Sequence, residues 1–93
     1  MSEFKGTIGT WFYRPDLAEV VCVGNGIIAD VISNGSEDEN GRLITAAPVL
    51  LEACLRSRNQ LYAAGYESKE VSLNPTEELL FQLESAIKKA LGK

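Results

Sequence analysis

The first third of the chain contains three short apolar or aromatic runs separated by turn-forming residues. The runs are residues 11–14, 19–23 and 27–32. Aromatic and β-branched residues favour strands, and short runs bounded by Gly, Pro, Asn or Ser are typical of strands joined by turns. We therefore expect a three-stranded antiparallel meander over about residues 10–33.

Two turns connect these expected strands. Pro15 ends the aromatic run and predicts a first turn near residues 15–18. Asn25-Gly26 is the preferred pair for a two-residue type I′ loop, because both positions need a positive φ. With this loop, Val21 would pair with Asp30.

From residue 36 onward the apolar spacing becomes helical. Ser36 and Glu39 have the spacing of a capping box and predict a helix over about residues 37–46. Pro48 lacks a backbone N–H and disfavours helix at the residue before it, so a second helix is expected over about residues 48–64. This helix should end near Gly65.

The last third of the chain predicts one amphipathic helix over about residues 75–91. Asn74 is a good N-cap, Pro75 suits the first helical turn, and Glu77 adds a negative charge there. An apolar stripe follows helical spacing: Leu79, Leu80, Leu83, Ile87, Ala90 and Leu91. The expected fold is α+β, with an N-terminal meander, a Pro-bent helix pair and a C-terminal helix in a single domain, 1–93.

Charge and apolar run length exclude several partners. The chain has 13 acidic and 9 basic residues and a net charge of −4, which disfavours duplex nucleic acid. The longest apolar run, residues 46–51, is far shorter than the ~20 residues that span a bilayer. No basic segment leads into an apolar one at the start of the sequence. We expect a cytoplasmic protein without a membrane partner.

Few residues of this chain suit catalysis. It has no His, the commonest general base and metal ligand. Cys22 and Cys54 lack the spacing of metal ligands and are expected in the core. Asp30 is expected to point outward from its strand, and the acidic run 37–39 is expected to be a solvated helix start. We predict no catalytic set, no metal, no cofactor and no enzymatic activity.

Aromatic and arginine side chains are the candidates for binding. Aromatic rings can stack on a base or anchor a protein partner, and arginine can hold a phosphate or carboxylate through two hydrogen bonds. The candidate residues are Trp11, Tyr13, Arg42, Arg56, Arg58 and Tyr62.

Two segments resemble small accessory proteins encoded by tailed phages and prophages. Residues 6–11 are similar to a Thr-Pro-Gly-Pro-Trp opening. Residues 40–53 are similar to the string Asn-Ala-Arg-Leu-Ile-Ala-Ala-Ala-Pro-Glu-Leu-Leu-Glu-Ala. The chain departs from these patterns at five positions: Ile8, Thr10, Gly41, Thr45 and Val49. Within the second segment we expect Leu43, Ile44, Leu50 and Leu51 to pack inward.

The resemblance implies a phage origin and the cytoplasm of an infected bacterium. Phage accessory proteins of this size often act by stoichiometric binding, so it favours a protein that binds and neutralises a host protein, including in anti-defence. The alternative is a sponge, in which a pocket between subunits sequesters a small signalling nucleotide without cleaving it. A pocket combining Arg42, Arg56 or Arg58 with an aromatic ring would indicate the sponge, whereas a partly apolar patch would indicate protein binding. A homodimer joined through the apolar stripe of the last helix is expected in either case.

Overall fold

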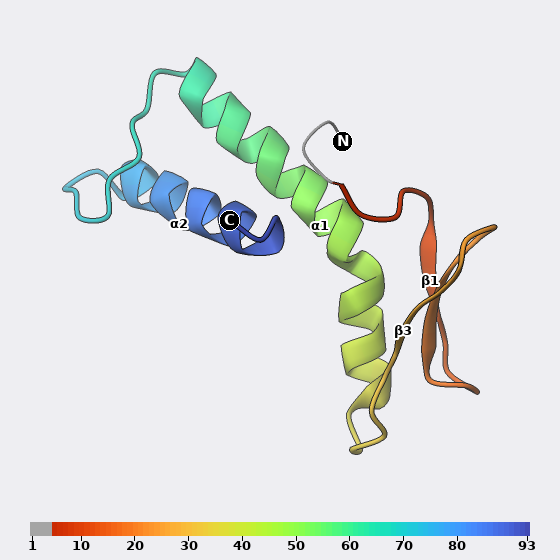
Figure 1. Ribbon diagram of the computed structural model, residues 1–93. Coiled ribbons are helices and arrows are strands. Elements are labelled where there is room, and N and C mark those ends of the chain that lie inside the picture. Colours follow the sequence, from red (N-terminus) through yellow and green to blue (C-terminus); the bar gives the residue numbers. More distant parts are fainter. Residues whose placement is uncertain (1–4) are drawn as a thin grey trace. The chain divides into compact units, whose positions relative to one another are not determined.

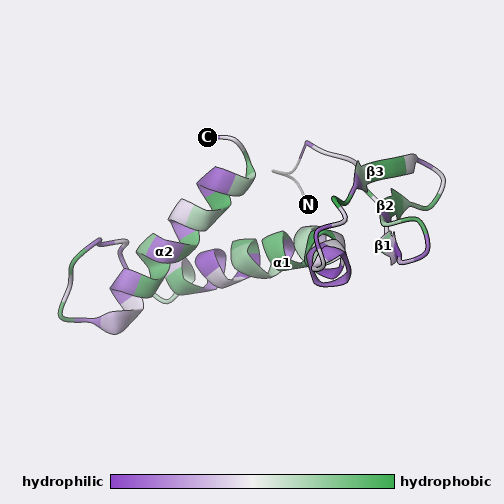
Figure 2. Ribbon diagram, turned by 90° about the horizontal axis from the view of Figure 1, so that it is seen from below, coloured by the Kyte–Doolittle hydropathy of each residue, from purple (hydrophilic) through white to green (hydrophobic). Residues whose placement is uncertain are grey.

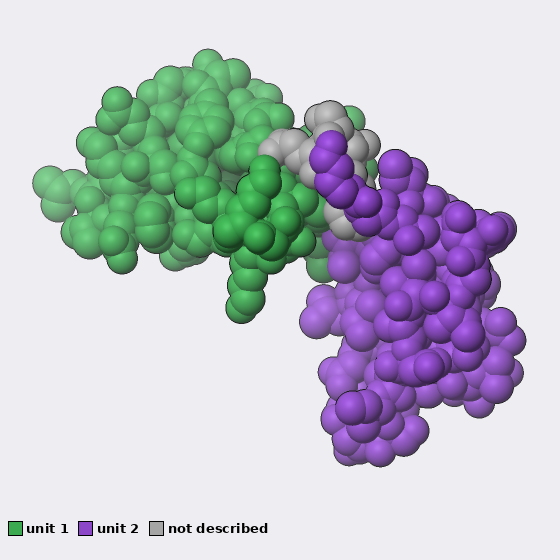
Figure 3. Space-filling view, viewed as in Figure 1, with its two compact units in different colours: residues 1–4, 50–93 green, residues 5–49 purple. Residues whose placement is uncertain are grey.

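The computed structural model of the protein describes residues 5–93, in which three strands are followed by two helices (Figure 1). In chain order these are β1 (Trp11–Arg14), β2 (Glu19–Cys22), β3 (Gly26–Asp30), α1 (Glu37–Ala63) and α2 (Pro75–Ala90). The predicted α+β class and N-terminal meander are confirmed. The described residues divide into two compact units, which Figure 3 shows in different colours. We call residues 5–49 the β unit and residues 50–93 the α unit.

The sheet of the β unit has the strand order β1-β2-β3, and both pairings are antiparallel. In the first pairing Trp11 lies opposite Cys22 and Arg14 lies opposite Glu19. The central strand is also the most buried, because three of its four residues, Val20 to Cys22, are buried. The buried residues of the sheet therefore lie mainly on β2, the strand that is paired on both sides.

The turn between β2 and β3 differs from the predicted Asn25-Gly26 loop. Cys22 pairs with Gly26, and the Asn25 N–H donates to the Cys22 carbonyl over 3.0 Å. The positive φ angles fall on Gly24 (81°) and Gly26 (83°) rather than on Asn25. Gly24 supplies the positive φ at the third position of a turn that begins at Cys22, so the loop starts earlier than Asn-Gly alone suggests.

The register of β3 changes as a result. Val21 pairs with Ile27, and Asp30 pairs with Glu19. The predicted pairing of Val21 with Asp30 is therefore wrong. An irregularity between Val20 and Val21 shifts the register, as a β-bulge does when it places two residues of one strand opposite one of its partner.

The predicted break at Pro48 is also wrong, because α1 continues through it. A proline inside a helix removes one hydrogen bond, here to the Ile44 carbonyl, and costs roughly 3 kcal/mol. The residues on both sides extend a helix that has already nucleated, and each adds a hydrogen bond. Two predicted short helices therefore form one helix of 27 residues.

The hydrogen bonds at the start of α1 are made by other side chains than those of the predicted pair, Ser36 and Glu39. The Asn34 Oδ1 accepts the Ser36 N–H over 2.9 Å, and Glu37 Oε2 accepts the Gly35 N–H over 2.8 Å. These contacts hold the turn that leads into the helix. The acidic residues of the first turn, 37–39, suit the positive end of the helix dipole.

The helix ends in the α unit follow the sequence closely. Gly65 has a φ of 91°, its N–H donates to Tyr62 O, and the Tyr66 N–H donates to Leu61 O. This is the Schellman pattern expected at a C-terminal glycine. At α2, Asn74 Oδ1 accepts the Thr76 N–H over 3.0 Å. Both predicted helix ends are confirmed.

The α unit has a small apolar core between its two helices. Leu51 and Leu55 of α1 pack with Ile87 of α2, and Cys54 and Leu91 pack against this cluster. Figure 2 shows hydrophobic residues along both helices. Burying a side chain of this size contributes about 1.5–3 kcal/mol. Leu80, with no exposed surface, adds a further buried position on α2.

Fewer apolar residues are buried around Pro48 than the sequence predicts. Of the four residues expected to pack inward around Pro48, Leu51 is buried and Ile44 is half-buried, while Leu43 and Leu50 are exposed. Cys22 is buried as predicted, whereas Cys54 is half-buried. Within residues 5–93, no helix combines the length and hydrophobicity needed to cross a membrane.

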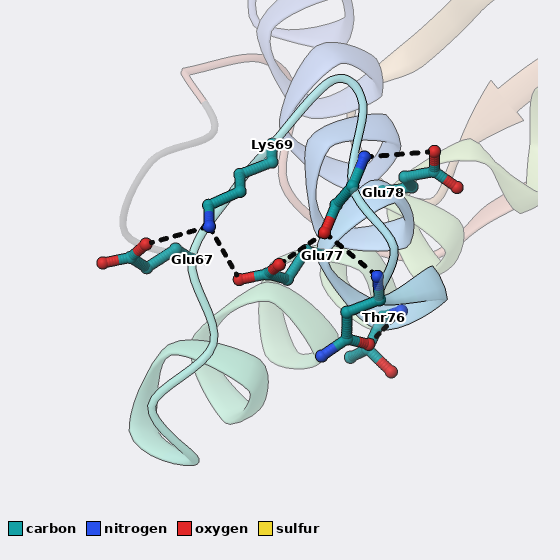
Figure 4. Close-up of polar contacts among 7 residues, drawn as sticks. Glu67, Lys69, Thr76, Glu77 and Glu78 are labelled. Carbon is teal, nitrogen blue, oxygen red and sulfur yellow. Dashed lines mark hydrogen bonds and ion pairs between the residues drawn. The ribbon is translucent and has the colours of Figure 1, made fainter.

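The connector between the helices is folded back onto the start of α2 (Figure 4). The Lys69 ammonium lies 3.7 Å from carboxylate oxygens of Glu67 and Glu77. The Ser72 hydroxyl donates to Glu77 Oε1 over 2.6 Å, and the Ser72 N–H donates to Glu78 Oε1 over 3.4 Å. Two acidic residues of the first helical turn therefore hold the connector in place.

Candidate functional site

Tyr13 joins the sheet of the β unit to the first turns of α1. Its hydroxyl donates to Asp38 Oδ1 over 2.9 Å. Its ring lies against the helix at Gly41, where a Cβ atom would overlap the ring carbons Cδ1 and Cε1. Gly41 is buried. The glycine is thus required by the space that the tyrosine ring takes, although glycine is unfavourable inside a helix by about 1 kcal/mol relative to alanine.

The surroundings of Tyr13 raise its pKa above the ordinary value of a phenol. The main cause is desolvation, followed by the hydrogen bond to Asp38 and the negative charges of Asp38 and Glu37; Arg42 acts in the opposite direction. The hydroxyl therefore stays protonated near neutral pH and acts as a hydrogen-bond donor within the fold. The hydrogen bond to Asp38 and the fit against Gly41 give Tyr13 a structural role within the β unit.

Two further candidates belong to the β unit. Trp11 is half-buried, and its Nε1–H donates to the Thr7 carbonyl over 3.2 Å. Arg42 is exposed on α1, on the side from which its charge reaches Tyr13. Trp11 and Tyr13 are two positions apart on β1 and so share one face of the sheet. The structure thus brings Tyr13 and Arg42 into electrostatic contact and places Trp11 on the same face of β1 as Tyr13.

The other three candidates lie on the part of α1 within the α unit. Arg56 is exposed, with Nε 3.9 Å from Glu52 Oε1. Arg58 is half-buried and donates from Nε and Nη2 to Asn59 Oδ1. Tyr62 is 47% exposed. The six predicted residues are therefore divided equally between the two units.

An open pocket of about 620 Å³ lies between the two helices of the α unit. Leu61, Leu79 and Leu83 form its apolar part. Arg56, Ser57 and Gln60 add its polar lining. Of the predicted residues, it contains Arg56 alone. Both Leu79 and Leu83 belong to the apolar stripe predicted on α2. Leu79 is exposed and Leu83 is half-buried, because the stripe is wider than the part of α2 that α1 covers.

A second pocket, of about 420 Å³, belongs to the β unit. The end of β3 and the residues after it contribute Asp30, Val31, Ile32 and Asn34, and α1 contributes Asn40, Leu43 and Ile44. Asp30 is exposed, as predicted for an outward-facing residue. The exposed Leu43 that the sequence placed in the core lines this pocket instead. Neither pocket is lined by an aromatic ring.

Acidic and thiol groups are dispersed over the described part of the chain. Among residues 5–93 no three His, Cys, Asp or Glu side chains come close enough together to hold a metal ion. Cys22 Sγ contacts the Ile8 carbonyl over 3.7 Å and lies next to Gly9, where a Cβ atom would approach to 2.8 Å. This thiol therefore fills space between the β2 strand and the segment before β1.

The whole chain, residues 1–93, matches the family described as Salmonella phage P22 protein Y8K6. No curated protein and no solved structure matches it. A match over the full length shows the family, and it agrees with the resemblance to phage accessory proteins carried by residues 6–11 and 40–53. The protein belongs to the Salmonella phage P22 protein Y8K6 family.

Proposed function

We propose that this phage protein binds and neutralises a host protein in the cytoplasm of the infected cell, in the manner of a stoichiometric anti-defence inhibitor. The observation that carries the proposal is the open apolar pocket between α1 and α2. Leu79 is 49% exposed there although it belongs to the stripe that packs the two helices together. An apolar side chain left exposed beside a helix pair favours contact with another protein.

The composition of this pocket suits a protein partner. Protein interfaces combine an apolar centre with a polar rim, and arginine is enriched in them. Here Leu61, Leu79 and Leu83 are the apolar centre, and Arg56 and Gln60 add polar groups. We propose that an apolar side chain of the host protein enters between the helices, with Arg56 contacting a carboxylate or carbonyl beside it.

The nucleotide sponge has no comparable support. It requires an arginine and an aromatic ring in one concave pocket, so that phosphate and base are bound together. Arg56 lines the α-unit pocket without a ring, and neither an arginine nor a ring lines the pocket of the β unit. We therefore favour protein binding.

The test is capture of host proteins by the tagged protein in infected cells, with mass spectrometry of proteins and of released small molecules. The combined substitution Leu79→Glu and Leu83→Glu should abolish capture, because it places charge in the apolar centre of the pocket. Leu73→Glu is the matched control, because Leu73 is fully exposed in the connector. It should leave capture unchanged.

Three outcomes would contradict the proposal. The first is capture of the same host protein by the double variant, and the second is release of a nucleotide as the only bound species. The third is conversion of a substrate at far less than one protein per target, because a binder inhibits in linear proportion to its amount until the target is saturated.

The proposed homodimer would use the same two leucines. Ile87 of the predicted stripe is already buried against α1, and Leu80 is also buried. Light scattering at micromolar concentration should therefore show a dimer that the Leu79→Glu, Leu83→Glu variant dissociates. Such a result together with unchanged host capture would assign this surface to self-association instead.

A further inference from the structure

β3 is an edge strand with free backbone groups. In the described sheet it pairs with β2 alone. The Val31 N–H, just after the strand, donates to the Ala18 carbonyl over 2.8 Å. Neighbouring residues of an antiparallel strand direct their N–H and C=O groups to opposite sides. The backbone N–H and C=O of Asp30 therefore point away from β2, toward the open edge.

The pocket of the β unit lies between this strand end and a helix. Val31 and Ile32 follow β3, and Leu43 and Ile44 come from α1. Ile32 is 80% exposed and Leu43 is 64% exposed. An unpaired strand edge bordered by an apolar pocket can bind an extended peptide, with main-chain hydrogen bonds giving affinity and the pocket taking alternate side chains.

We call the open edge of β3 together with this pocket the groove. The unit that carries the groove is predominantly acidic. Residues 5–49 contain six acidic and three basic side chains. Asp30 lines the groove and is exposed, and the exposed Glu39 lies four residues before Leu43, on the same side of α1. Arg42 is two residues beyond Asn40, on nearly the opposite side of α1, because successive residues turn by about 100°. The groove therefore attracts a basic segment.

We propose that the groove between β3 and α1 binds an extended, basic segment of another protein by strand addition. One apolar side chain of that segment enters the pocket between Ile32 and Leu43, and an adjacent lysine or arginine pairs with Asp30. This site shares no residue with the pocket between α1 and α2, so it is a second interaction surface and does not depend on the function proposed above.

Two other occupants fit these observations less well. A second copy of this chain, pairing edge to edge, would bring together two units that each contain six acidic and three basic side chains in residues 5–49, and their like net charges repel. A helix cannot use the free N–H and C=O of Asp30, because its own backbone groups are already paired. An extended basic segment can form hydrogen bonds with the free backbone groups of Asp30 and can also pair with its carboxylate.

The test is selection of short random peptides displayed against the full chain. Enriched peptides should alternate apolar and basic residues, as a strand with one face in the pocket requires. N-methylation of alternate backbone nitrogens in a selected peptide should weaken binding about tenfold, the effect of losing about one net backbone hydrogen bond. Methylation of the intervening nitrogens should have little effect.

A pair of matched variants shows whether binding depends on the groove itself or only on the net negative charge of the β unit. Asp30→Lys should weaken binding of the selected peptide about five- to tenfold at low salt. Asp16→Lys makes the same charge change at an exposed turn position of the same unit and should change binding less than about twofold. Leu43→Glu should also abolish binding, while circular dichroism shows that the helices are retained.

Several results would overturn the proposal. Selection that enriches no peptide, or acidic peptides, or apolar residues at helical spacing, excludes a basic added strand. Equal sensitivity to N-methylation at both sets of nitrogens excludes strand pairing, and equal losses for Asp30→Lys and Asp16→Lys exclude this groove. Because Leu79 and Leu83 play no part here, the peptide should still bind the Leu79→Glu, Leu83→Glu variant whatever host capture shows.

Discussion

Each of the two units of this small protein is stabilised by a different kind of internal contact. In the α unit, apolar side chains of two helices bury one another, as Leu51, Leu55 and Ile87 do. In the β unit, the strand and the helix meet through one specific fit, in which the Tyr13 ring lies against Gly41 and its hydroxyl reaches Asp38. The first contact depends on buried volume, and the second on shape and a hydrogen bond.

This difference predicts different tolerance to substitution. An apolar cluster accepts a side chain of similar volume but loses stability when volume is removed. A ring packed on a helix backbone accepts no added atom at the glycine, however favourable that atom is for the helix. The charges differ as well, because residues 50–93 contain six acidic and six basic side chains, whereas the β unit is acidic.

The largest effect should come from removing volume in the α unit. Ile87 is 3% exposed, and Ile87→Ala should lower the free energy of unfolding by about 2–5 kcal/mol, whereas Ile87→Val should cost only about 0.5–1.5 kcal/mol. Urea denaturation followed by far-ultraviolet circular dichroism measures both. Equal losses for the two variants would show that the cluster does not depend on volume.

A sharper test of the β unit is Gly41→Ala. Alanine favours the helix by about 1 kcal/mol, but the added methyl group overlaps the Tyr13 ring and should destabilise the protein by a net of about 1–3 kcal/mol. In a Tyr13→Ala background the same substitution should stabilise it by up to about 1 kcal/mol. Emission of Trp11, the one tryptophan in the chain, reports unfolding of this unit. Stabilisation in both backgrounds would contradict the contact.

The smallest effect concerns pH. The pKa of Tyr13 is raised above 10.0 in the folded protein, so its contribution to stability is complete below about pH 10 and is lost as the pH rises through the folded-state value. The reason is that ionisation removes the donor and places a phenolate beside Asp38. Wild type should therefore lose more stability than Tyr13→Phe between about pH 9 and pH 11.

Local sequence rules were sufficient where one residue type satisfies one backbone requirement. Asn74 and Pro75 start α2, and Gly65 ends α1, as predicted, because caps need only their immediate neighbours. The same rules gave the wrong answer at Pro48 and at the β2–β3 turn. At Pro48 the hydrogen bonds of the flanking turns outweigh a single missing donor. At the turn, Gly24 competes with Asn25-Gly26 for the positive φ angles.

The surroundings of the candidate residues could not be predicted from the sequence. The partial burial of Tyr13 against Gly41 was not foreseen, because this contact joins residues 28 positions apart. The sequence shows that the pocket leucines Leu79 and Leu83 are apolar, but not that Leu79 remains exposed and Leu83 only half-buried. An apolar stripe shows that a face can be buried, but not how much of it the partner helix covers.

The sequence by itself determined the α+β class, a three-stranded meander followed by helices, the helix ends at Gly65 and Asn74, and the acidic charge of residues 5–49. These follow from periodicity, composition and contacts between near neighbours. Only the tertiary structure decided the register of β3, the fit of Tyr13 against Gly41, and the two pockets. Those features depend on contacts between side chains that are far apart in the sequence. Many such apolar contacts are possible, and spacing along the chain does not show which of them form.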